Sequence, residues 1–338
     1  MTTTSILAAA DLSKAPRDLL PLLIAPIMVL VALPLVGSPT TWVTLTVAAL
    51  AMGMMIFVIA SGLTLIFGLM DVLNFGHGAF IAIGAYIAMT VLVPLSGWIQ
   101  SDALTLNLAA LLLAVTAAMV GTGALGWCFE RVIVRPVYGQ HLKQILITMG
   151  GLIVAEQLIH VAWGGDQKPM PLPNGLRGAI TIGDFALEKF RLLAVAVGLT
   201  VFTVMQLVLN RTKVGLLIRA GVENREMVEA LGYRIRQLFV GVFVAGSALA
   251  GLGGTMWALY RETLTAAIGG DVMVMVFIVI IIGGLGSVGG CFLGAILVAL
   301  MANYTGYLAP KIAVASNILL MVAILMWRPQ GLYPVARR

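Results

Sequence analysis

Polar residues interrupt one strongly apolar stretch of this chain, residues 59–85. The stretch holds Asp71, Asn74 and His77, and glycines stand among them. Ionisable side chains at membrane depth are costly and usually face a bundle interior or a watery cavity. Backbone broken by glycine is tolerated at that depth only where it is buried in protein or lines such a cavity. The stretch therefore predicts a broken membrane helix beside a solute pathway, lined by Asp71, Asn74, Gly76, His77 and Gly78.

A structural role for the same residues stays open beside this one. Spaced by three, Asp71, Asn74 and His77 would lie near one face of a helix. Asn74 could instead cap a helix that begins near His77. Asp71 could mark the cytoplasmic end of the preceding apolar span. The two roles do not exclude each other.

A second glycine-rich segment, residues 283–290, joins two apolar runs. A glycine string of this kind is a hinge, a close helix contact or a second broken-helix site. The runs that begin at Gly76 and at Gly289 are loosely alike, and transporters built from two repeats place interrupted helices at matching positions. The predicted solute pathway therefore also includes Gly283, Gly284, Gly286 and Ser287.

One further polar pair lies within an apolar span. Glu156 and His160 are four residues apart, so they would share one helix face. One interpretation of the pair is functional, as a proton relay or a contact with the solute. The other is structural, as an interhelical hydrogen bond in which Gln157 takes part. A proton-coupled carrier would use Glu156 together with Asp71.

Enzyme chemistry finds little support in the residues. A P-loop needs a Gly-Lys-Ser/Thr turn, and no lysine follows a glycine, so any ATP hydrolysis belongs to another chain. Ser61 precedes Gly62 without a nucleophile-elbow pattern. The histidines and the two cysteines, Cys128 and Cys291, are too scattered for a zinc motif. We expect no catalytic residue, metal or cofactor.

Composition sets the fold class. The chain is 61% hydrophobic and 10% charged, with a mean hydropathy of +1.06, whereas soluble domains average about 25% charged residues. A crossing helix needs ~20 apolar residues. We predict an all-α polytopic membrane protein of eight to ten crossings, with broken or re-entrant segments. The apolar runs are residues 19–37, 42–66, 77–95, 104–129, 144–163, 191–210, 237–259, 272–285, 289–308 and 312–327.

Basic residues between the spans predict the orientation, because Lys and Arg favour cytoplasmic loops. The net charge of +6 is therefore attributed to topology and not to nucleic-acid binding. We expect a cytoplasmic arm 1–18, a membrane domain 19–328, a cytoplasmic loop 211–236 and a cytoplasmic tail 329–338. Loop 164–190 lies on the opposite side, either as a docking surface for an extracytoplasmic partner or as a connector.

The cytoplasmic loop contains a predicted amphipathic helix. Its acidic residues recur at intervals of three, an apolar face lies beside them, and a glycine follows as a C-cap. The acidic face fits poorly against anionic lipid, so we expect this helix to enter a groove on another protein. The residues concerned are Glu223, Glu226, Met227, Glu229, Ala230, Leu231 and Gly232.

Several of these motifs resemble the LivH-type permeases of branched-chain amino-acid ABC importers. The resemblance runs in the same order from about residue 45 to 335, and the first forty residues lie outside it. The motifs are G-L-T-L-I-F-G-L-M-D-V-L-N-F-G-H-G-A-F (62–80), W-G-G-D-Q-K-P-M-P-L-P (163–173), A-G-V-E-N-R-E-M-V-E-A-L-G-Y (220–233), I-I-G-G-L-G-S-V-G-G (281–290) and R-P-Q-G-L-Y-P (328–334).

The resemblance implies a permease subunit in the bacterial inner membrane, in contact with lipid. Its partners would be a second, LivM-like permease, two ABC ATPases and a periplasmic solute-binding protein. The family's ATPase-coupling helix maps onto Val222 to Gly232, and its N-F-x-H-G stretch maps onto residues 74–78. Gly76 stands where many relatives have Ala, and Glu156 departs from the usual character of its span. The same family also carries permeases for urea, short amides and aromatic acids.

Two other classes of protein remain as alternatives. A proton-coupled secondary carrier would need no ATPase partner, and its uptake would collapse with an uncoupler. A scaffold protein would carry no solute, and the pathway glycines and the amphipathic helix argue against it.

Overall fold

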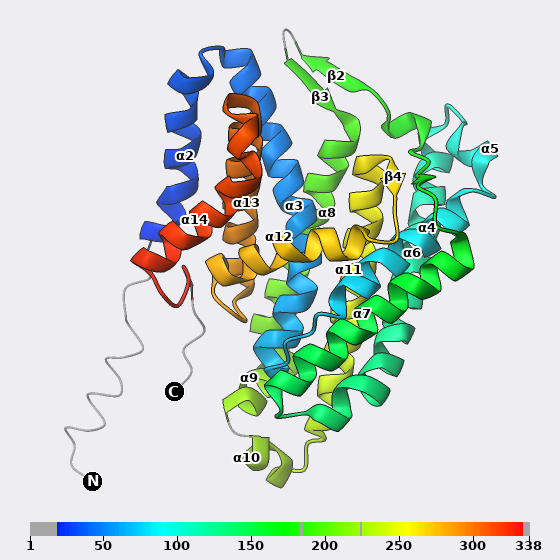
Figure 1. The fold of residues 1–338 in the computed structure, drawn as a ribbon, viewed down its shortest axis with the longest axis vertical. Coiled ribbons are helices and arrows are strands. Elements are labelled where there is room, and N and C mark those ends of the chain that lie inside the picture. Colours follow the sequence, from blue (N-terminus) through cyan, green and yellow to red (C-terminus); the bar gives the residue numbers. More distant parts are fainter. Residues whose placement is uncertain (1–18, 183–184, 224, 334–338) are drawn as a thin grey trace.

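The computed structural model describes residues 19–182, 185–223 and 225–333, and this part of the chain is all-α apart from two short strand pairs (Figure 1). The predicted arm 1–18 and the last five residues lie outside the described part. Six helices are long and apolar enough to cross a membrane. They are α3 (Pro39–Met70), α6 with its extension (Leu104–Val137), α7 (His141–Trp163), α8 (Lys189–Arg211), α11 (Ile235–Arg261) and α13 (Val288–Leu308).

Four shorter apolar helices complete the bundle, and all ten coincide with the ten apolar runs of the sequence. They are α2 (Leu20–Val36), α4 (His77–Leu92), α12 (Ile268–Gly283) and α14 (Ala313–Trp327). At about 1.5 Å per residue, the 16 residues of α4 or α12 fall short of the ~30 Å hydrocarbon core. The all-α polytopic class is confirmed, and these short helices fit the expectation of broken segments.

Helix α3 lies at the centre of the bundle, packed against α13, α11 and α8. Ser38 caps its first turn by accepting a hydrogen bond from Thr41 N, and Pro39 stands at its first position. Seventeen of its residues are buried. Helices α7 and α8 are much less buried, and exposed side chains such as Leu158 and Val161 cover the outer face of α7. These outer faces are suited to lipid or to another membrane subunit.

Small elements close the two ends of the bundle. One end carries α9 (Lys213–Glu223) and α10 (Arg225–Ala230) (Figure 1). The other carries the antiparallel pair β2–β3 and the pair β1–β4. The remaining elements are α5 (Ser96–Ile99), η2 (Glu130–Val134), η3 (Arg135–Val137), β1 (Lys168–Pro169), η4 (Asn174–Leu176), β2 (Ala179–Ile182), β3 (Phe185–Glu188), β4 (Thr263–Leu264) and η5 (Pro310–Ile312).

Glycine allows α4 and α12 to meet at their first turns. A β-carbon at Gly78 would lie 3.0 Å from the carbonyl oxygen of Gly269. Helix α12 then runs across the direction of α3 and α13 (Figure 1). The sequence expectation placed its start at residue 272, and the helix begins four residues earlier, at Ile268. This earlier start is what brings the two helix N-termini together.

Candidate functional site

The α3–α4 elbow, residues 71–76, interrupts the helical backbone where the sequence predicted a break. Asp71 ends α3 in the left-handed conformation, with φ of 53°. Phe75 anchors the elbow to two neighbouring helices. Its N–H donates to Thr148 Oγ1 of α7 at 3.2 Å, and its ring lies 4.6 Å from that of Phe277 in α12. The elbow is therefore held between α7 and α12.

Two side chains of the elbow region are completely buried and carry unsatisfied polar atoms. Asn74 and His77 are both 0% exposed. The Nε2 atom of His77 lies 3.0 Å from the carbonyl oxygen of Ile59, while its Nδ1 has no hydrogen-bond partner. Among the described residues, neither amide atom of Asn74 has a hydrogen-bond partner. Buried polar groups without partners are rare in folded proteins and mark sites where water, an ion or a ligand binds.

One structural expectation for this region is wrong, and the condition for another is not met. Asn74 does not cap α4 with its side chain, because the N-cap is Gly76 and Asn74 contributes only its backbone oxygen, to His77 N. Asp71, Asn74 and His77 do not share a helix face, because residues 71–74 are not helical. The Asp71 side chain is 46% exposed and lies 4.0 Å from His141, apart from the buried pair.

The second glycine-rich segment lies against the end of α3. A β-carbon at Gly68 would lie 2.7 Å from Gly286 Cα. Gly284 and Gly286 have positive φ values of 96° and 82°, which turn the chain between α12 and α13. The side chain of Ser287 caps α13 by accepting from Gly290 N at 3.1 Å. The four predicted residues of this segment thus form a turn that touches the first predicted segment.

The C-terminal run reaches the same place. The N–H of Leu332 donates to the carbonyl of Ile282 at 2.9 Å, and that of Tyr333 donates to Gly283 at 3.0 Å. Leu332 is 1% exposed. The first residues of the predicted tail are therefore fixed to the end of α12, beside Gly283 and Gly284.

The contact of Gly68 with Gly286 leads to a testable prediction. We expect Gly68→Ala to destabilise the protein by about 1–3 kcal/mol, because the new methyl group meets backbone and not a flexible side chain. Gly306→Ala is the matched control, since Gly306 also lies in a helix and a methyl group added there would have nothing within 4 Å. Thermal unfolding in detergent measures both variants. Equal unfolding temperatures for the two would contradict the close contact.

Glu156 and His160 both lie on α7. Glu156 is partly exposed and His160 is exposed. The Glu156 carboxylate is near the start of α12, 3.4 Å from where a β-carbon of Gly270 would be. Within the described residues the Glu156 carboxylate makes no hydrogen bond, so the interhelical hydrogen bond that was one of the two expectations for this pair is not formed.

The segment that was predicted to be cytoplasmic carries α9 and α10, and residue 224 between them lies outside the described part. Helix α9 ends at Glu223 and α10 begins at Arg225. Gly232 is the expected C-cap, with φ of 86° and the hydrogen bond Tyr233 N to Val228 O at 3.3 Å. The side chains of Glu223 and Glu226 lie outside the described part, and Glu229 and Ala230 are exposed.

The apolar residues of α10 divide between the inside and the outside. Val228 is 2% exposed, and it fixes α10 to the rest of the chain. Met227 and Leu231 are 54% and 69% exposed. Large apolar side chains at such exposure on a helix outside the bundle are suited to contact with another surface.

Sequence reasoning missed one buried charge. Glu130 is 2% exposed and stands in the π-helical turn η2, where its Oε1 accepts a hydrogen bond from Tyr138 at 2.6 Å. A cavity of about 260 Å³ beside it is also lined by Arg135, Arg236 and Phe239. In the sequence, Glu130 directly follows the apolar run 104–129, as a polar residue at the end of a span would. Tyr138, eight residues later, was the one sequence feature that could have indicated its hydrogen-bond partner.

Comparison with known proteins places this geometry in a family. A family model described as branched-chain amino acid transport system, permease component, matches residues 45–327. The chain belongs to this family. It is therefore a multi-pass membrane permease of the ABC-importer type and not a catalytic enzyme in itself. The family assignment favours the importer permease over the proton-coupled carrier.

Individual permeases of this family are similar along most of their length. The chain is 27% identical to the high-affinity branched-chain amino acid permease protein BraD of Pseudomonas aeruginosa, covering 85% of this chain and 94% of BraD. It is 24% identical to LivH of Escherichia coli K12 (81% of this chain, 89% of LivH). It is 26% identical to LivM of the same strain (98% of this chain, 78% of LivM). No solved structure matches the chain.

Three of the motif runs that resemble LivH-type permeases converge in space. Residues 62–80, 281–290 and 328–333 meet where α3 ends, through Gly68 against Gly286 and Leu332 against Ile282. The permease thus concentrates its motifs at the two backbone breaks. This convergence makes the elbow the candidate functional site.

Proposed function

We propose that the permease carries branched-chain or related amino acids across the bacterial inner membrane. The observation that carries this proposal is the family match over residues 45–327, and relatives named for branched-chain amino acids support it. The partners would be a second, LivM-like permease, two ABC ATPases and a periplasmic binding protein. ATP would bind only to the ATPases, because the chain has no P-loop sequence.

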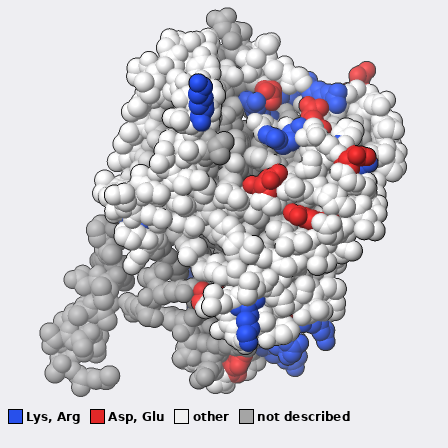
Figure 2. All heavy atoms as spheres, in the orientation of Figure 1, with Lys and Arg blue, Asp and Glu red and all other residues white. Residues whose placement is uncertain are grey.

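The proposed orientation puts both termini and α10 in the cytoplasm. Lys and Arg lie together at the end of the molecule that carries α9 and α10, with Asp or Glu near them, and charges of both signs also lie at the opposite end (Figure 2). In the sequence, residues 211–236 hold six Lys and Arg residues but three Glu residues. Arg131 stacks on Trp127 with its guanidinium 5.5 Å from the ring centroid, and Arg328 stacks on Trp327 at 4.5 Å. Such Arg–Trp pairs are suited to the membrane interface. An excess of Lys and Arg in the loops at one end of a membrane protein predicts that this end faces the cytoplasm.

The proposed mechanism couples two sides of the membrane. The binding protein docks on the external loop 164–190, in which the β2–β3 hairpin projects from the bundle (Figure 1). Helix α10 enters a groove on an ATPase, and closure of the ATPases moves α10. The movement passes along the bundle to the α3–α4 elbow and the 283–290 turn, around which the solute path changes sides.

Purification of the complex tests the proposal. The tagged permease is taken from its native membrane in mild detergent, and the accompanying proteins are identified and quantified by mass spectrometry. We expect a second permease and two ATPases in comparable amounts. After reconstitution, L-leucine uptake should require ATP and the binding protein, and L-valine should compete where urea and acetamide do not. A permease that emerges alone and takes up solute on a proton gradient would overturn the proposal.

A further inference from the structure

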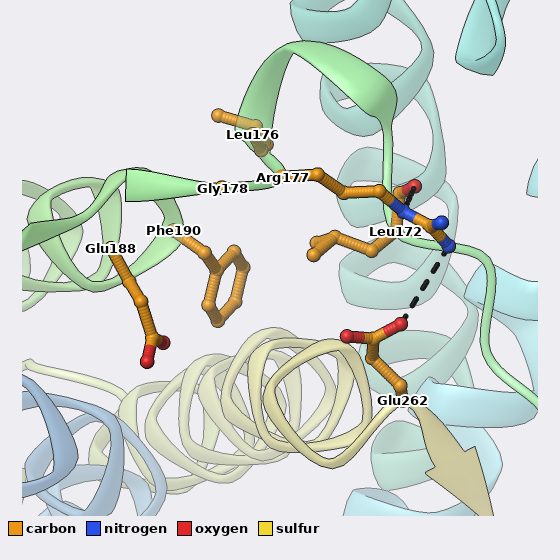
Figure 3. A pocket seen from close by; sticks show the side chains of 7 residues that line it. All are labelled: Leu172, Leu176, Arg177, Gly178, Glu188, Phe190 and Glu262. Carbon is orange, nitrogen blue, oxygen red and sulfur yellow. Dashed lines mark hydrogen bonds and ion pairs between the residues drawn. The ribbon is translucent and has the colours of Figure 1, made fainter. Parts of the chain in front are cut away.

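A cavity of about 280 Å³ opens at the end of the molecule that carries the 164–190 loop (Figure 3). It lies apart from the elbow, between this loop, the start of α8 and the end of α11. Its volume is close to the lower end of small-molecule pockets, about 300 Å³. The lining residues are Leu172, Leu176, Arg177, Gly178, Glu188, Phe190 and Glu262.

The cavity has a fixed apolar wall. Leu172, Leu176 and Phe190 are 7%, 6% and 4% exposed, so their positions are set by packing. The ring of Phe190 lies between the Glu188 side chain and the Arg177–Glu262 pair (Figure 3). Without rearrangement of the protein, the side chain of a small ligand would contact only the small exposed parts of these three residues.

Charges of both signs stand beside the apolar wall. Arg177 Nη2 lies 3.6 Å from Glu262 Oε2, and the two side chains are 55% and 53% exposed. Arg177 Nε donates to the carbonyl of Leu172 at 3.1 Å, which orients the guanidinium. Glu188 pairs with Arg191 at 2.8 Å. An exposed ion pair contributes little to stability, so Arg177 and Glu262 can exchange their mutual contact for contacts with a ligand.

The backbone fixes the carboxylate of Glu262 at this place. Glu262 ends α11 in the left-handed conformation, with φ of 51°, where glycine is the unstrained residue. Its carbonyl accepts from Met170 N at 3.0 Å, and Lys168 pairs with Leu264 in the β1–β4 ladder. The chain thus holds a strained acidic residue where α11 meets the external loop, and such strain is often associated with function.

We propose that this cavity is an external receiving site for a free α-amino acid with an aliphatic side chain. Arg177 binds the α-carboxylate, Glu262 binds the α-ammonium group, and the Leu172, Leu176 and Phe190 wall receives the side chain. The proposal rests on the proposed function, both for the cargo and for the side of the membrane. The site would take the amino acid after release from the binding protein and before entry into the bundle.

Ligand analogues test the wild-type complex directly. L-Leucine binding to the purified complex in lipid nanodiscs, without ATP, is measured by saturation-transfer NMR. We expect 4-methylpentanoate, which lacks the ammonium group, and 3-methylbutylamine, which lacks the carboxylate, to bind at least about tenfold more weakly. Equal binding of either analogue, or absence of leucine binding at millimolar concentration, would overturn the proposal.

Two variants, each of which removes one charged side chain, test which residue binds the carboxylate and which binds the ammonium group of the ligand. Arg177→Gln should weaken leucine binding at least tenfold and leave 3-methylbutylamine unaffected. Glu262→Gln should weaken leucine binding similarly and leave 4-methylpentanoate unaffected. Arg261→Gln is the matched control, because Arg261 is an exposed neighbour that does not line the cavity, and its leucine binding should match the wild type.

Two further measurements separate the possible failures. If Arg177→Gln and Glu262→Gln weaken docking of the binding protein but leave leucine binding unchanged, the cavity is a protein contact and the inference is wrong. If the complex takes up leucine with ATP while neither variant changes leucine binding, only the inference fails. If the wild-type complex takes up no amino acid, the proposed function fails, and the inference fails with it.

Discussion

Replacing Met227 and Leu231 together by Asp is expected to reduce ATP-driven uptake by at least about tenfold. These side chains are 54% and 69% exposed on α10 and the turn that follows it. Truncating an apolar anchor in a packed interface costs about 2 kcal/mol or more, and about 1.4 kcal/mol is tenfold in binding. Two carboxylates placed in an apolar groove weaken the contact further, because burying an unpaired charge is costly.

The measurement compares uptake into proteoliposomes with the amount of ATPase that co-purifies. Met227→Leu with Leu231→Met is the matched control, since it keeps both positions apolar and of similar volume. The thermal stability of the permease should be unchanged in both variants. The buried residue that anchors α10 is Val228, and neither variant changes it. Full uptake and normal ATPase content in the Asp variant would show that α10 is not the coupling contact.

Helix positions in this chain follow from apolar length alone. All ten runs found in the sequence are helices, because a crossing segment must satisfy its backbone hydrogen bonds internally. The break between α3 and α4 was also predictable, since Asp, Asn and glycines stand together in an apolar stretch. The packing of the two breaks against each other could not be predicted, because the contact of Gly68 with Gly286 joins residues over two hundred positions apart.

Side-chain environments were harder to predict than the backbone. Periodicity grouped Asp71 with Asn74 and His77, but the left-handed turn at Asp71 directs it towards His141 and leaves the other two buried. Glu130 directly follows the apolar run 104–129, and that local pattern does not indicate that Tyr138 holds it inside the protein. The 280 Å³ cavity joins residues of loop 164–190 to Glu262 at the end of α11. None of these relations is contained in a local sequence pattern.

Replacing Asn74 by Leu should raise the stability of the protein and at the same time abolish most uptake. Neither amide atom of Asn74 has a hydrogen-bond partner in the part of the chain that the structure describes, and the side chain is 0% exposed. Leaving a buried polar group unsatisfied costs about 1–3 kcal/mol, and a leucine, which has the same number of side-chain heavy atoms in the same branched arrangement, removes that cost. A residue retained against its own stability is expected to serve the solute path.

Asn107 provides the matched control, because it is equally buried but fully hydrogen-bonded. Its Nδ2 donates to the carbonyls of Trp98, Ser101 and Ala103, and its Oδ1 accepts from Gly175 N at 2.6 Å. Asn107→Leu should therefore lower the unfolding temperature, whereas Asn74→Leu should raise it. If Asn74→Leu also lowers it, the amide of Asn74 has a partner in the membrane. If stability rises and uptake is unchanged, Asn74 is not part of the solute path.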